Sequence, residues 1–119
     1  MLWTIDEKKI KNIPHKDHYG RIKSSLTKEE YDNIYEELNN KIDTNEVHTS
    51  SWMPGHNWQE TVYEPLYTKA AKYNREVSGL LFGIMLWVVL MERGDDWSFG
   101  RYKKGEIDIK GMTYFRIHR

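Results

Sequence analysis

The apolar stretch at residues 77–91 constrains the fold more than any other part of the chain. Nearly every side chain in it is apolar, so a helix formed there has to be enclosed on almost every side. The stretch is shorter than the roughly 20 residues that cross a bilayer, and Ser78, Gly79 and Gly83 interrupt it. We therefore predict a central core helix, with a membrane segment as the minor alternative.

Sequence signals mark both ends of this helix. Asn74 can cap the first turn, because its side chain accepts a hydrogen bond from a free backbone N–H group. Gly94 follows the last apolar residues, where a left-handed glycine often ends a helix. Gly79 and Gly83 lie on one face, and each has about 1 kcal/mol less helix propensity than Ala. We expect another backbone or a bulky ring to approach closely there.

A second helix is predicted at residues 27–43. Thr27 and Glu30 form a capping box, in which the hydroxyl and the carboxylate each accept a hydrogen bond from a free backbone N–H group. Apolar side chains then recur at three- and four-residue steps and give one buried stripe. The stripe consists of Tyr31, Ile34, Tyr35, Leu38 and Ile42.

Shorter elements are predicted around these two helices. Residues 1–6 are compatible with an edge strand, and residues 15–25 look like a polar, basic loop. Residues 46–52 favour a strand that stops at the turn formed by Pro54 and Gly55. Residues 61–73 suggest a short helix with Pro65 in its first turn.

The end of the chain predicts an antiparallel hairpin. Residues 97–102 and 112–117 alternate between apolar and polar side chains, and a turn-forming segment separates them. A chain of 119 residues has the usual size of one domain. We therefore predict a single α+β domain over residues 1–119, in which the central buried helix packs with an N-terminal helix and a small antiparallel sheet that includes the C-terminal hairpin.

Composition excludes several classes of site. The chain has no cysteine, so it has no disulfide, thiolate metal site or cysteine nucleophile. Lys plus Arg and Asp plus Glu number 18 each, so the net charge offers no general attraction to nucleic acid or to membranes. Residues 1–11 contain no apolar run of signal-peptide length, and we expect a cytoplasmic protein, in a host cell.

The histidines give weak signals for chemistry. His15, His18, His48 and His56 are candidates for a metal site, but imidazoles in polar loops are more often solvated, and we expect no metal or cofactor. His48 also begins a histidine-x-hydroxyl pattern, which two-histidine phosphoesterases use to hold a phosphate and protonate a leaving oxygen. Those enzymes need two copies, and this chain has one.

Two groups of aromatic and basic residues are candidates for binding. The loop at residues 50–58 places Trp and Met around a tight turn, as in many interface hot spots, although such rings also serve as lids on a core. The terminal hairpin combines arginines with tyrosines, which suits phosphate or base recognition, or else reflects a solvated strand face. The candidate binding residues are Trp52, His56, Trp58, Arg101, Tyr102, Tyr114 and Arg116.

In general character the chain resembles small accessory proteins of bacteriophages and mobile elements, including inhibitors of bacterial defence systems. It is short, cysteine-free and rich in aromatic residues, and it lacks a catalytic signature. The resemblance covers overall character and transfers no functional residue. It implies a non-catalytic binding module that inhibits a host macromolecule, such as a defence or nucleic-acid-processing protein.

Two other functions remain open at this point. One is an enzyme acting on a phosphodiester or nucleotide, with His48 as acid or base and Arg101 or Arg116 on the phosphate. The other is a protein that sequesters a nucleotide in a pocket of rings and arginines. A homodimer is compatible with each, because surplus rings on a small domain often form a self-complementary surface.

Overall fold

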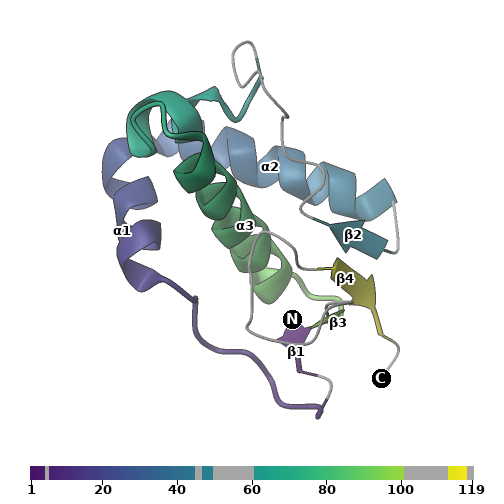
Figure 1. Cartoon of the computed structure of the whole chain (residues 1–119). Helices are drawn as coiled ribbons and strands as arrows, with labels where there is room; N and C mark the ends of the chain where they lie inside the picture. The colour runs from purple at the N-terminus through teal and green to yellow at the C-terminus, as the bar shows by residue number, and fades with distance from the viewer. Residues whose placement is uncertain (5, 45–46, 50–60, 101–112, 118–119) are drawn as a thin grey trace.

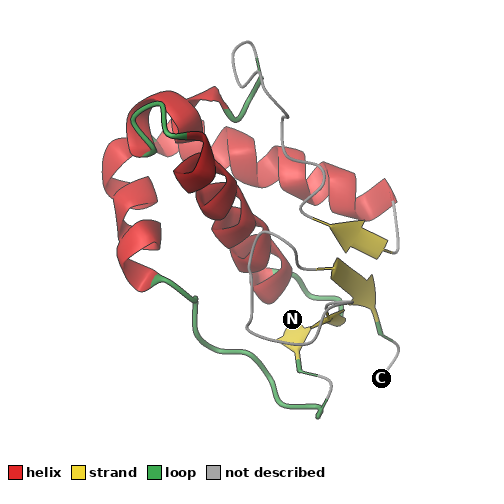
Figure 2. Cartoon of the chain, viewed as in Figure 1, coloured by secondary structure: helices red, strands yellow, loops and turns green. Residues whose placement is uncertain are grey.

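The computed structural model describes residues 1–4, 6–44, 47–49, 61–100 and 113–117. The elements in chain order are β1 (Leu2–Trp3), α1 (Lys16–Ser25), α2 (Lys28–Thr44), β2 (Val47–Thr49), the π-helix η2 (Leu66–Ala70), α3 (Arg75–Glu92), β3 (Trp97–Gly100) and β4 (Thr113–Arg116). Helices and one small sheet share the fold, which confirms the α+β class (Figure 2).

The helix α3 is the central element, as predicted. It contacts α1, α2, η2 and β1, and Figure 1 shows it running from the helical end of the molecule towards the sheet. Residues 81–90 are all buried, so the apolar stretch forms the core. In the described part of the chain, none of the helices has both the length and the apolar character that a membrane span requires.

The two ends of α3 differ in how well they match the sequence signals. Asn74 caps the helix as predicted, because its side-chain oxygen accepts a hydrogen bond from the Val77 N–H group at 3.1 Å. The predicted left-handed cap at Gly94 is wrong, since the Gly94 backbone is not left-handed and Arg93 is extended with ψ 155°. The Arg93 side chain binds Asp95 two residues later, just before β3 begins at Trp97.

The capping box of α2 is confirmed. The Thr27 N–H group donates to Glu30 at 2.9 Å, and the Glu30 N–H group donates to the Thr27 hydroxyl at 3.1 Å. Glu30 also binds the Lys69 amine at 2.7 Å, which ties the start of α2 to η2. The predicted apolar stripe faces the core, where Ile34, Leu38 and Ile42 are fully buried.

The helix α1 corrects the prediction of a loop at residues 15–25. Its local signals are poor, because His15 stands at the N-cap with φ 54° and makes no side-chain cap hydrogen bond. Packing supplies what the local sequence lacks, since Ile22 is fully buried, Leu26 is nearly so and Tyr19 packs against the same core. Short helices generally depend on such tertiary contacts.

The sheet has the strand order β1-β3-β4-β2. The pair β3 and β4 is antiparallel, as the hairpin prediction required, and the segment that joins them lies outside the described residues. β2 pairs antiparallel with β4 and falls within the strand predicted at residues 46–52. β1 is the expected edge strand but pairs parallel with β3, so the sheet is mixed rather than purely antiparallel.

The short helix predicted at residues 61–73 is a π-helix preceded by Pro65. Its geometry is defined by the hydrogen bond from the Ala71 N–H group to the Leu66 carbonyl oxygen at 2.8 Å, which spans five residues. Lys72 and Tyr73 then adopt positive φ angles of 51° and 67°. This turn exposes the Tyr73 ring, whose exposed fraction is 65%.

Candidate functional site

An apolar groove of about 440 Å³ lies where the N-terminal segment meets α3 and β3. Its volume falls at the low end of the range found for ligand pockets. Its walls are mainly apolar and come from segments that are distant in the sequence. The lining residues are Thr4, Lys9, Ile10, Lys11, Asn12, Ile13, Pro14, Trp87 and Phe99.

Trp87 of α3 holds the two walls of the groove together. Its indole N–H group donates to the Asn12 carbonyl oxygen at 3.3 Å, which ties the N-terminal segment to the core helix. Its ring centroid lies 4.9 Å from that of Phe99 on β3, with the rings tilted by 54°. Trp87 itself is only 4% exposed. The Trp87 ring therefore forms the floor of the groove, and its contacts with Asn12 and Phe99 hold it in place.

Backbone hydrogen bonds fix the other side of the groove. The Ile10 N–H group donates to the Leu2 carbonyl oxygen at 2.7 Å, and Trp3 forms an antiparallel bridge with Lys9. Pro14 restricts Ile13 to extended geometry, so Ile13 stays beside the groove before α1 begins. Both walls are therefore held in place by contacts within the protein.

The rim of the groove is basic. Lys9 and Lys11, which we call the lysine rim, line the groove and are exposed, and Lys8 and Lys16 are exposed nearby in the sequence. None of these four lysines forms an ion pair within the part of the chain that the structure describes.

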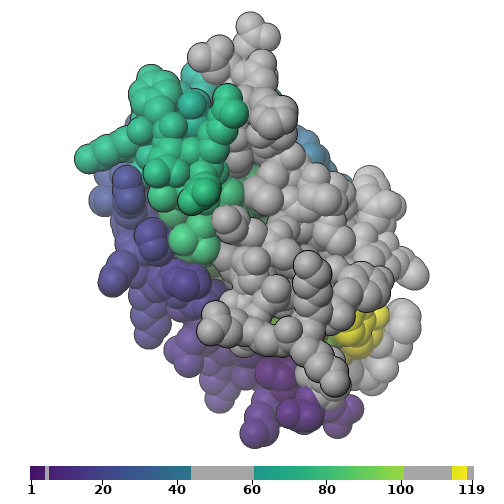
Figure 3. Space-filling view, in the orientation of Figure 1, coloured from purple at the N-terminus to yellow at the C-terminus, as the bar shows by residue number. Residues whose placement is uncertain are grey.

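Charge is unevenly distributed along this neutral chain. Residues 1–28 contain seven Lys and Arg against three Asp and Glu, whereas residues 29–46 contain seven Asp and Glu against one Lys. In the space-filling view, the described N-terminal segment and α1 occupy the same side of the molecule (Figure 3). The lysine rim belongs to this basic side.

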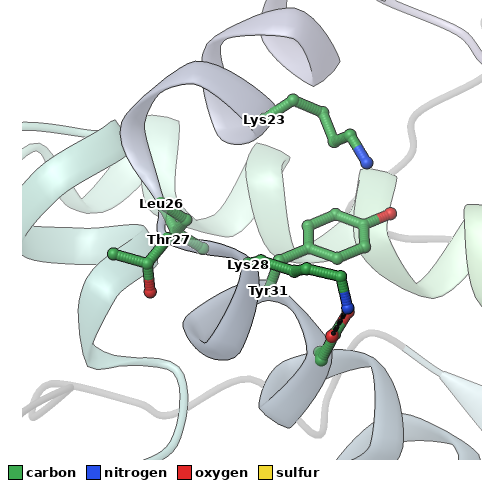
Figure 4. Close-up of a pocket in the computed structure, with 6 residues that line it drawn as sticks. Lys23, Leu26, Thr27, Lys28 and Tyr31 are labelled. Atoms are coloured by element: carbon green, nitrogen blue, oxygen red, sulfur yellow. Dashed lines mark hydrogen bonds and ion pairs between the residues drawn. The ribbon is translucent and has the colours of Figure 1, made fainter.

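A second hollow, of about 290 Å³, lies at the junction of α1 and α2 (Figure 4). Its polar groups already have partners. The Lys23 amine lies 4.3 Å from the centroid of the Tyr31 ring, and Lys28 binds Asp32 at 2.8 Å. The Tyr31 hydroxyl is hydrogen-bonded to that of Tyr19 at 2.9 Å, and burial together with this bond raises the pKa of Tyr31. The hollow therefore shows no unengaged charge for a ligand.

Most of the predicted binding residues lie outside the described part of the chain. These are Trp52, His56, Trp58, Arg101 and Tyr102.

Tyr114 does not fit the predicted role at a binding surface. It pairs with Phe99 on the face of the sheet that carries the buried Trp97, and it is fully buried. Its hydroxyl has no hydrogen-bond partner within the described residues, and burial raises its pKa. The ring therefore belongs to the core.

Arg116 is partly buried and contacts two groups of the protein, and its predicted role in binding stays a prediction. One of its terminal nitrogens lies 3.4 Å from an Asp95 oxygen, and its guanidinium carbon lies 5.1 Å from the centroid of the Trp97 ring. Arg93 binds the same carboxylate through two hydrogen bonds of 2.9 Å. The hydrogen bonds from Arg93 are the largest cause of a lowered Asp95 pKa, and the charge of Arg116 acts in the same direction. Because both cations favour the ionised carboxylate, the pKa of Asp95 falls to about 2.

Asp95 and Asp96 lie between the end of α3 and the start of β3 and belong to the same cluster. Both are half-buried, and the Asp96 carboxylate accepts a hydrogen bond from the Trp3 indole at 2.8 Å. Arg93 extends the cluster to α2 through Asn39 at 2.8 Å and Asp43 at 2.6 Å. The cluster joins α2, the end of α3 and the sheet.

The histidines are not assembled into a metal site in the described part of the chain, where no group of three potential ligands occurs. His15 and His18 lie near each other, with ring centroids 6.0 Å apart. The backbone of His48 pairs with Tyr114 in the sheet. The side chain of His48 and the whole of His56 and Arg101 lie outside the description, so the enzyme alternative stays a prediction.

Sequence reasoning missed the groove. Ile10 and Ile13 are three residues apart in an otherwise polar segment, and from this spacing before Pro14 a partly buried attachment could have been predicted. The pairing of that segment with Trp87 and Phe99 depends on the fold.

The chain matches no protein-family model, and comparison with curated proteins and with solved structures found no match.

Proposed function

We propose that this protein is a non-catalytic binding module that docks onto a partner protein through the apolar groove. The observation that carries this proposal is the groove itself, in which apolar side chains from residues 10–14, α3 and β3 surround an open hollow. Concave apolar sites that receive a large side chain are typical positions of interface hot spots. Hydrogen bonds at Trp87 and Ile10 preform the site, which reduces the entropy lost on binding.

The groove is the anchor of a larger contact surface. A standard interface takes about 800 Å² from each partner, which is more than one groove provides. The neighbouring basic side of the molecule supplies the surrounding surface. In the proposal, the partner is a host protein, such as a defence or nucleic-acid-processing protein. Binding inhibits this partner by covering one of its functional surfaces. The general character of the sequence supports this choice of partner.

Affinity capture with matched variants tests the docking function. Ile13→Ser removes part of the apolar wall of the groove. Tyr73→Ser is the control, because it removes an exposed ring that lies outside the groove, at the other end of α3. We expect the wild type and Tyr73→Ser to retain the same partner from host lysate at a defined stoichiometry, and Ile13→Ser to weaken retention by about tenfold or more. Ile10→Ser serves as a second groove variant, and circular dichroism checks the fold of each.

Two results would overturn the proposal. One is a partner that binds Ile13→Ser and Ile10→Ser as well as the wild type. The other is turnover of a phosphodiester or nucleotide by the purified protein without any partner, which would favour the enzyme alternative.

A further inference from the structure

The chemistry of the groove narrows the class of partner. Its walls accept apolar side chains, while Lys9 and Lys11 stand at its edge without ion pairs among the described residues. An apolar ligand alone would leave these charges unused. A ligand that places carboxylates beside an apolar side chain satisfies both parts of the site.

The position of the lysines makes them effective for recognition. They occupy a segment that is tied to β1 by the bridge at Trp3 and to α3 by the hydrogen bond from Trp87. Their backbone is therefore fixed relative to the groove. Lys8 and Lys16 extend the positive field on either side of the same segment. A fixed array of like charges attracts an oppositely charged segment and favours its correct orientation.

The same groove is poorly suited to nucleic acid. Binding of single strands relies on exposed aromatic faces on which bases stack. Here the Trp87 ring is 4% exposed and packed against Phe99, and the remaining apolar walls are aliphatic. None of the residues that line the groove is an arginine, and Arg93 and Arg116 are engaged with Asp95. A protein segment therefore fits the observations better than a nucleic acid does.

We infer that the groove binds an acidic, apolar segment of a partner protein, with a large apolar side chain in the groove and Asp or Glu residues beside it on the lysine rim. This inference rests on the docking function proposed above and adds the chemistry of the partner. The contact is non-covalent, and its electrostatic part weakens as salt increases.

Fluorescence anisotropy with defined probes tests the inference on the full chain. The main probe is a short labelled peptide whose central Leu-Phe-Leu is flanked by glutamates. The comparison probes are the same peptide with lysines in place of glutamates, the acidic peptide with serines in place of the apolar residues, and a labelled single-stranded oligonucleotide. We expect saturable binding of the acidic apolar peptide with a Kd of about 10–100 μM. Each comparison probe should bind about tenfold more weakly or not at all.

Charge variants locate this binding on the rim. The double variant Lys9→Glu, Lys11→Glu should weaken the acidic peptide about tenfold and reduce the salt dependence of its Kd. Lys72→Glu is the matched control, because Lys72 is also exposed and precedes α3, which extends roughly 18 Å from its first residue, Arg75, to Trp87. It should change the Kd by less than about twofold. The lysine positions are exposed, so these variants leave the core unchanged.

The outcomes separate this inference from the docking function. If affinity capture depends on Ile13 but neither the captured partner nor the acidic peptide responds to the rim variant, the groove docks a partner and the inferred chemistry is wrong. Tighter binding of the oligonucleotide than of the peptide, lost on the same lysine changes, would also overturn the inference. If Ile13→Ser affects neither capture nor peptide binding, both proposals fail.

Discussion

At the residue scale, the most connected side chain in the described structure is Arg93. It is largely buried, with 14% of its side chain exposed, and its guanidinium reaches Asn39, Asp43 and Asp95. A guanidinium makes several directed hydrogen bonds at once, which a lysine amine cannot reproduce. The sequence shows an arginine near two aspartates at the end of a helix, but their mutual geometry depends on α2 and β4, which are distant in the chain.

The Arg93–Asp95 pair predicts a specific acid sensitivity. The pKa of Asp95 is about 2 in the folded protein and about 4 in an unfolded chain. The stabilisation is therefore complete above pH 4 and is lost as the pH falls from 4 to 2. We expect Asp95→Asn to lower the free energy of unfolding by about 2 kcal/mol at pH 7 and by much less near pH 2, as measured by urea denaturation.

The exposed pair of Lys28 and Asp32 provides the control for that measurement. Its side chains are 91% and 54% exposed, so water screens their attraction. Asp32→Asn should change the free energy of unfolding far less than Asp95→Asn does. Equal effects of the two substitutions at pH 7 would contradict the assigned role of Asp95.

The tyrosines predict an alkaline transition. Burial is the first cause of the raised pKa values of four tyrosines, which are Tyr31, Tyr35, Tyr63 and Tyr114. Tyr35 also donates a hydrogen bond to Glu92, and its pKa reaches about 12. An unfolded chain loses these protons near pH 10. The unfolded state then binds fewer protons than the folded state, so stability should fall as the pH rises above 10.

Absorbance of tyrosinate, followed together with circular dichroism, tests this transition. We expect part of the tyrosine signal to appear only with loss of the fold, and all of it to appear in one step near pH 10 in denaturant. Ionisation of all eight tyrosines near pH 10 with the fold intact would contradict the burial of these rings.

At the element scale, the sequence predicted α2 and α3 because their signals are local. The capping box at Thr27, the cap at Asn74 and the apolar residues 77–91 each act within a few residues or a single helix. The helix α1 was missed because its stability comes from Ile22 packing against other elements. The mixed pairing of β1 was missed for the same reason, since a two-residue strand carries no information about its neighbour.

The capping box predicts a measurable contribution to stability. Thr27→Ala removes the hydroxyl that accepts from the Glu30 N–H group, and we expect a loss of about 1 kcal/mol in the free energy of unfolding. Ser24→Ala is the control, because the Ser24 hydroxyl also bonds to backbone but is exposed and caps no helix start. Urea denaturation of both variants gives the comparison. A Thr27→Ala effect no larger than that of Ser24→Ala would contradict the capping role.

At the scale of the whole molecule, α3 serves the core and the proposed site together. Its buried residues fill the interior, and Trp87 near its C-terminal end floors the groove. The sequence predicted the first role and not the second, because the groove exists only where residues 9–14 and Phe99 are brought to that tryptophan. Charge is likewise organised at this scale, with an excess of basic residues on α1 and on the segment that lines the groove, and an excess of acidic residues along α2.

Hydrogen–deuterium exchange of the full chain, free and saturated with the acidic apolar peptide, tests most directly whether the groove is the docking site. Bound peptide should slow exchange in residues 8–14 and leave α2 and the turn at Lys72 unchanged. Protection centred on α2, on that turn or on η2, with residues 8–14 unaffected, would contradict the proposed site.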